Sequence, residues 1–135
     1  MADTILIIDF GSQLTQLIAR RLRETGVYTE ILPCTTAPDN IAAAAPNGII
    51  LSGGPNSVAL ANTPRAPEIV FDLKVPILGI CYGQQVMVQQ LGGVVEAGES
   101  EGREFGRAYV DVVDVSPITK NIWEKGAHEQ VWMSH

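Results

Sequence analysis

The chain has few cysteines, few basic residues and no long hydrophobic run. Its 135 residues include two cysteines, Cys34 and Cys81, which argues against a disulfide framework and favours free thiols in a reducing cytoplasm. Nine Lys and Arg residues oppose 15 Asp and Glu residues, a net charge of -6, which disfavours contact with nucleic-acid phosphates. Apolar stretches such as 5–8 and 49–51 are far shorter than the roughly 18–20 residues that cross a bilayer. Neither nucleic acid nor a membrane is expected as a partner.

Two nucleotide-binding motifs are also missing. No G-x-G-x-x-G follows the first apolar run, and no G-x-x-x-x-G-K-[ST] occurs anywhere, so nucleotide binding by this chain has no motif support. Residues 52–57 are close to an S-G-G-x-D-S phosphate loop, but Pro55 removes a backbone donor and Asn56 replaces the acid. We therefore expect no cofactor and no metal in this part of the protein.

Apolar runs alternate with amphipathic segments from residue 4 to residue 93. Residues 4–9 have the nearly continuous apolar character of a strand buried on both faces. A helix is expected to follow, with Ser12 as its N-cap and Gly26 at its end. The alternation continues with strands expected at 27–32, 48–52 and 76–81, and helices at 38–45, 68–73 and 84–91. This order predicts an α/β fold with an open, mostly parallel sheet and helices on both faces.

The pattern changes after residue 93. Residues 108–115 alternate apolar and polar side chains, which predicts an antiparallel or half-exposed strand, and 129–133 can form another. The size suits one compact domain. Because the chain stops at a strand, we expect it to be incomplete at the C-terminus and marginally stable by itself.

A possible nucleophile lies where one of the predicted strands ends. Residues 79–83 read Gly-Ile-Cys-Tyr-Gly, the G-x-C-x-G form of a nucleophile elbow. Such a turn presents Cys81 at a helix N-terminus, where the dipole and free N–H groups favour the thiolate. A lone cysteine after an apolar strand usually packs in the core, but the two glycines favour the nucleophile. The glycine-rich backbone at 52–55 can aim an N–H at a developing oxyanion, with the Tyr82 N–H as second donor, or be a plain turn.

A base for this cysteine is hard to find. The chain has two histidines, of which His128 is expected on an exposed loop and His135 is the last residue, a poor platform for a base. Cys34, in a loop with proline and threonine, is expected to be incidental. Residues 103–106 form either an ordinary turn or the border of a site, and spacing does not decide between them.

Six segments in register resemble the class I (triad) glutamine amidotransferases, whose fold is flavodoxin-like, and within them the amidotransferase domain of the GMP synthase family. They are residues 8–13, 17–21, 51–55, 79–85, 103–106 and 131–135. The resemblance implies that Cys81 is the nucleophile and forms a glutamyl thioester. It also implies an oxyanion hole from the N–H groups of Gly54 and Tyr82, and a substrate pocket bordered by Gln85 and by the segment Ser134-His135.

The resemblance further implies a larger enzyme. In the family, ammonia from glutamine passes to a synthetase (ATP pyrophosphatase) domain, which uses ATP and Mg to convert XMP to GMP, and a C-terminal domain forms a homodimer. The catalytic H-x-E unit of the family does not occur in these 135 residues, and His135 corresponds to an earlier histidine. We therefore expect residues 1–135 to be a truncated amidotransferase domain of a cytoplasmic enzyme, with little glutamine turnover by itself.

Two alternatives remain open. The chain can belong to another class I enzyme, of anthranilate, carbamoyl phosphate or CTP synthesis, although the Asp-Phe-Gly-Ser-Gln start and the Arg-Glu-Phe-Gly segment favour the GMP synthase family. It can also be a non-catalytic flavodoxin-like module that keeps the elbow only as architecture. A partner domain with an S-G-G-x-D-S loop would distinguish the GMP synthase family from the other class I enzymes. Failure of Cys81 to react with a glutamine analogue would favour the non-catalytic module.

Overall fold

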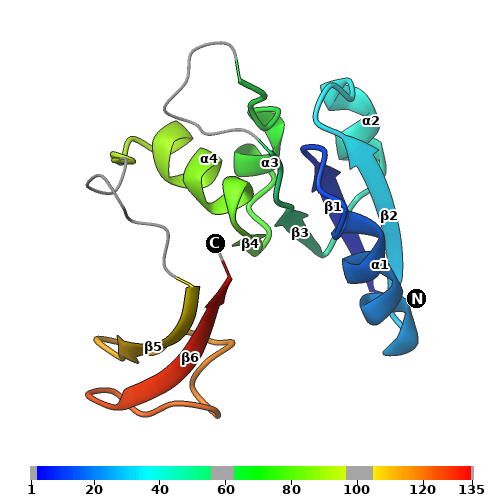
Figure 1. Ribbon diagram of the computed structural model, residues 1–135. Helices are drawn as coiled ribbons and strands as arrows, with labels where there is room; N and C mark the ends of the chain where they lie inside the picture. Colours follow the sequence, from blue (N-terminus) through cyan, green and yellow to red (C-terminus); the bar gives the residue numbers. More distant parts are fainter. Residues whose placement is uncertain (1–2, 56–62, 97–104, 135) are drawn as a thin grey trace. The chain divides into compact units, whose positions relative to one another are not determined.

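The computed structural model describes residues 3–55, 63–96 and 105–134 (Figure 1). The chain divides into two compact units, residues 1–96 and 97–135, and each is described by itself. The first unit carries a parallel sheet flanked by helices, and the second an antiparallel pair of strands. No helix in the described part of the chain is long and apolar enough to cross a membrane.

The sheet of the first unit has four parallel strands in the order β2-β1-β3-β4. The strands are β1 (Thr4–Asp9), β2 (Tyr28–Pro33), β3 (Gly48–Leu51) and β4 (Ile77–Gly79). In the register, Ile8 lies beside Leu51, so Asp9 and Ser52 follow at the same carboxyl-end edge. The parallel sheet expected from the apolar runs is therefore confirmed.

Helices cover both faces of this sheet. They are α1 (Thr15–Glu24), α2 (Pro38–Ala43), α3 (Ile69–Asp72) and α4 (Tyr82–Gln90). Successive strand residues point to opposite faces. Accordingly, Leu6 and Ile8 belong to one buried cluster with residues of α2, α3 and α4, whereas Ile7 packs with Ala19 of α1. The predicted α/β architecture is confirmed on both faces.

The beginnings of two helices differ from the sequence prediction. Helix α1 begins at Thr15 rather than next to Ser12, because the Ser12 hydroxyl accepts the Leu14 N–H (3.0 Å) and caps the turn before the helix. Helix α4 begins at Tyr82, two residues before Gln84, and follows Cys81 directly. Both helix starts thus lie close to the carboxyl ends of strands.

The second unit contains β5 (Phe105–Asp111) and β6 (His128–Ser134), which pair in antiparallel register. Both predicted strands are present, but the first covers residues 105–111 rather than 108–115, and the loop position predicted for His128 is wrong. His128 lies opposite Asp111 at the start of β6, its Nδ1 2.6 Å from Asp111 Oδ1. Its ring stacks on Tyr109, with centroids 4.7 Å apart. These cross-strand contacts hold the histidine in the ladder while its side chain stays exposed.

Candidate active site

Cys81 occupies a sharp turn between β4 and α4. Its backbone has φ 53° and ψ -118°, a left-handed conformation that is uncommon and strained for a residue with a side chain. The Cys81 carbonyl accepts the N–H groups of Gln84 (3.0 Å) and Gln85 (3.3 Å), which starts the helix at once. The thiol is exposed. The strand–turn–helix predicted around Cys81 is therefore present.

The two glycines that flank this turn are required by close packing. A Cβ on Gly79 would lie 2.7 Å from the Cα of Gln84, and a Cβ on Gly83 would lie 2.0 Å from the carbonyl oxygen of Leu51. Both distances are far below ordinary van der Waals contact. The glycines allow α4 to approach the ends of β3 and β4 and so hold Cys81 at the sheet edge.

A pocket of about 370 Å³ opens at this edge of the sheet. Its lining comes from three separate segments: Gly11, Ser12, Gln13 and Leu14; Gly53, Gly54 and Pro55; and Cys81. A Cβ on Gly53 would lie 3.4 Å from the Cβ of Cys81 and 3.7 Å from Oγ of Ser12. The segments that follow β1, β3 and β4 thus meet around the thiol.

Tyr82 fastens the start of α4 to the core. Its buried ring packs edge-on against Phe10, with centroids 5.3 Å apart and an interplanar angle of 69°. Its hydroxyl donates to the carbonyl of Pro64 and accepts from Arg65 Nη1 (3.2 Å). The ring therefore fixes the backbone of the residue that follows the thiol.

The other residues assigned by resemblance are distributed over both units. Gly54 lies in the pocket wall, close enough to Phe10 that a Cβ would come within 2.5 Å of the Phe10 carbonyl oxygen. Gln85 is partly buried in the first turn of α4. Ser134 ends β6 in the second unit. His135, together with residues 103–104 of the Arg-Glu-Phe-Gly segment, lies outside the described residues. The roles assigned to all of them stay predictions.

Sequence reasoning missed a polar cluster beneath the pocket. At the carboxyl ends of β1 and β3, the Thr15 hydroxyl donates to both Asp9 and Ser52. Thr15 and Ser52 are almost fully buried. The signal available in the sequence was the threonine on the buried side of α1, because a polar residue there needs a partner.

Cys34 follows β2 and contacts the apolar cluster on the α2 side of the sheet. Burial raises the pKa of the Cys34 thiol above its ordinary value. A backbone hydrogen bond lowers this pKa in part, and the negative charge of Asp9 adds a smaller increase. This thiol is held as the neutral form, unlike a cysteine prepared for nucleophilic attack.

Alkylation of Cys34 by iodoacetamide is therefore expected to reach half its maximal rate at a higher pH in the folded protein than in urea. The raised folded-state pKa means that the unfolded chain loses this proton first, so the associated stability falls as pH rises through the folded pKa. Mass spectrometry of a Cys81→Ala protein isolates the Cys34 signal. Equal midpoints in both states contradict the prediction.

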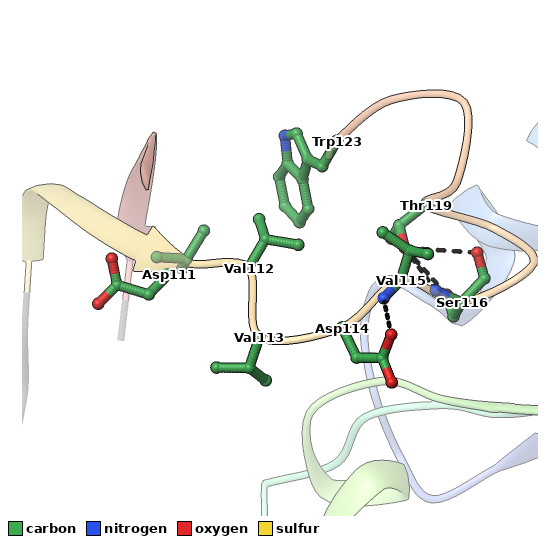
Figure 2. Close-up of a pocket in the computed structure, with 9 residues that line it drawn as sticks. Asp111, Val112, Val113, Asp114, Val115, Ser116, Thr119 and Trp123 are labelled. Carbon is green, nitrogen blue, oxygen red and sulfur yellow. Dashed lines mark hydrogen bonds between the residues drawn. The ribbon is translucent and has the colours of Figure 1, made fainter. Parts of the chain in front are cut away.

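A second pocket, also about 370 Å³, belongs to the second unit. It is lined by Val110, Asp111, Val112, Val113, Asp114, Val115, Ser116, Thr119 and Trp123. Figure 2 shows the Trp123 ring beside Val112, and Asp114 accepting the N–H of Val115 (2.9 Å). The lining is mostly apolar, and among the described residues it includes no cysteine or histidine. Among the described residues, no three His, Cys, Asp or Glu side chains gather to hold a metal ion.

Comparisons with known proteins match almost the whole chain. The family model for glutamine amidotransferase class-I matches residues 6–135. GMP synthase [glutamine-hydrolyzing] of Zymomonas mobilis is 56% identical over 135 residues, and that of Brucella melitensis biotype 1 is 57% identical over 133 residues. These matches cover 100% and 98% of this chain but only 26% of each relative, so the chain spans about a quarter of their length.

A solved structure supports the same assignment. The crystal structure of a Thermoplasma acidophilum protein, described as a GMP synthase subunit, superposes with a TM-score of 0.70 at 28% sequence identity. The match covers 98% of this chain and 64% of that chain. The fold, the elbow around Cys81 and the family match over residues 6–135 lead to one conclusion: the chain belongs to the class I glutamine amidotransferase family.

Proposed function

We propose that this chain is the glutamine-hydrolysing part of a GMP synthase. The observation that carries the proposal is the exposed Cys81 thiol, held at φ 53° in a pocket that the backbone of Gly53 and Gly54 also lines. A strained turn at a helix N-terminus is the arrangement that presents a nucleophile to substrate. Two relatives that share 56% and 57% identity with this chain carry the name GMP synthase [glutamine-hydrolyzing].

The proposed reaction has two steps. Cys81 Sγ attacks the side-chain amide carbon of glutamine, and the C–N bond breaks to release ammonia and leave a glutamyl thioester. Water then cleaves the thioester to give glutamate and the free thiol. The N–H groups of Gly54 and Tyr82 stabilise the oxyanion that develops in each step. Gln85 helps to hold the amino acid end of the substrate.

Proton transfer needs a further group. The leaving nitrogen must be protonated, and class I enzymes use the histidine of an H-x-E unit that residues 1–135 do not contain. We therefore assign the base to sequence outside residues 1–135 and expect these residues by themselves to turn over little glutamine.

The remaining steps belong to the rest of the proposed enzyme. Ammonia passes to a synthetase domain that uses ATP and Mg to convert XMP to GMP, in a homodimeric cytoplasmic protein. The names of the relatives, and the quarter of their length that this chain spans, support a larger GMP synthase.

A glutamine-like chloroketone tests the proposal directly. In the full-length polypeptide that contains residues 1–135, we expect the reagent to add one mass increment at Cys81 and none at Cys34, and free glutamine to slow the reaction. The two cysteines make a matched pair, because Cys34 is partly buried and lies outside the pocket lining. Equal labelling of both cysteines, or no protection by glutamine, refutes the proposal. Ammonia transfer to another acceptor than XMP assigns the chain to a different class I enzyme.

A further inference from the structure

A line of hydrogen bonds runs from a carboxylate to the wall of the Cys81 pocket. The single hydroxyl proton of Thr15 is shared between two acceptors, Asp9 Oδ1 (3.0 Å) and Ser52 Oγ (3.2 Å). Ser52, with no exposed surface, in turn donates to the carbonyl oxygen of Gly53 (3.4 Å). The line therefore links the end of β1, the first residue of α1 and the backbone beside the thiol.

The last contact in this line controls the direction of a neighbouring N–H. The carbonyl of Gly53 and the N–H of Gly54 belong to one peptide unit, which is planar. The described residues contain no cis peptide bond, so this carbonyl and this N–H point in opposite directions. A hydrogen bond that holds the Gly53 oxygen towards Ser52 thus fixes the direction of the Gly54 N–H.

Asp9 also acts on the facing wall of the pocket. Its Oδ1 accepts the N–H of Gly11 (2.9 Å), and Gly11 lines the pocket together with Ser12. One carboxylate oxygen consequently restrains both backbone segments that face Cys81. Valine at position 15 has nearly the volume of threonine and needs no partner, so packing alone does not call for a hydroxyl here.

We infer that Asp9, Thr15 and Ser52 are positioning residues that hold the Gly54 N–H in the direction needed to receive the oxyanion at Cys81. The inference rests on the proposed glutaminase function. The three residues do not touch substrate, and they act through the Gly53–Gly54 peptide. Loss of the Thr15 hydroxyl leaves the thiol in place and lowers stabilisation of the transition state.

The test compares two reagents on the full-length polypeptide. A glutamine-like chloroketone is held in the substrate pocket with its carbonyl oxygen at the oxyanion position while chloride leaves, whereas iodoacetamide has no glutamine-like group and reports the thiol alone. In Thr15→Val we expect kcat for glutamine hydrolysis to fall about 10- to 100-fold, since complete loss of an oxyanion donor costs more, with KM nearly unchanged. The chloroketone rate at Cys81 falls with kcat, the iodoacetamide rate stays, and Thr15→Ser restores most of the loss.

Two further variants separate positioning from folding. Thr29→Val removes another almost fully buried hydroxyl, in β2 and outside the pocket lining, and is expected to leave both rates unchanged. If Thr15→Val does not fold, Ser52→Ala repeats the test, because it removes a hydroxyl and adds no atoms to the core. The inference is overturned if kcat is unchanged in Ser52→Ala and in a folded Thr15→Val protein. It is also overturned if the chloroketone and iodoacetamide reactions slow equally. A wild-type protein whose Cys81 ignores the chloroketone instead refutes the proposed function.

Discussion

Gly83→Ala is expected to unfold the first unit of the protein. The added Cβ would lie 2.0 Å from the carbonyl oxygen of Leu51, 2.5 Å from its carbonyl carbon and 2.8 Å from its Cβ. Leu51 cannot retreat, because it is fully buried and β3 pairs on one side with β1 and on the other with β4. The helix must therefore move away, which also removes Tyr82 and Val86 from the core.

The direction of this effect opposes helix propensity. Alanine inside a helix is favoured over glycine by about 1 kcal/mol, whereas the clash is expected to lower the free energy of unfolding by more than about 4 kcal/mol, at the severe end for single substitutions. Urea unfolding followed by circular dichroism measures the change.

Gly53→Ala is the matched control for Gly83→Ala. Its Cβ would meet the Cβ of Cys81 at 3.4 Å, an ordinary contact, so this variant is expected to fold. A Gly83→Ala protein with the unfolding midpoint of wild type would show that α4 does not approach β3 as described.

Cys81→Ala is expected to abolish glutamine-dependent ammonia release in the full-length polypeptide. No other residue that lines the pocket carries a thiol, so no thioester can form. We expect a loss of at least about 10⁴-fold, in the range seen when an enzyme loses its nucleophile. If the protein is the proposed GMP synthase, supplied ammonia bypasses this site, and ammonia-dependent conversion of XMP is expected to continue at the wild-type rate.

Cys34→Ala provides the comparison for this loss. It removes a thiol of the same unit outside the pocket lining and is expected to retain glutamine-dependent ammonia release. Residual turnover in Cys81→Ala above one part in about 10³ would assign the attack to another group, since a missing nucleophile costs more than that.

The sheet and the elbow were predictable because their causes are local in sequence. A strand buried on both faces is an apolar run, as in β1, and the turn at Cys81 is marked by the glycines two residues to either side. The contact of His128 with Asp111 was not predictable, because it joins residues 17 positions apart through strand register. The contacts of Thr15 with Asp9 and Ser52 were missed for the same reason, because they form only after β1 and β3 have paired.

At Cys81, backbone stability and the proposed chemistry favour different residues, because the backbone is left-handed there. Glycine is the residue that adopts φ 53° without steric cost, whereas the proposed chemistry needs a thiol there. The contacts of α4 with the sheet offset the unfavourable free energy of this conformation. The backbone geometry at Cys81 therefore exists only in the folded protein. Stability alone would favour glycine at position 81, whereas the proposed function requires the thiol at that backbone conformation.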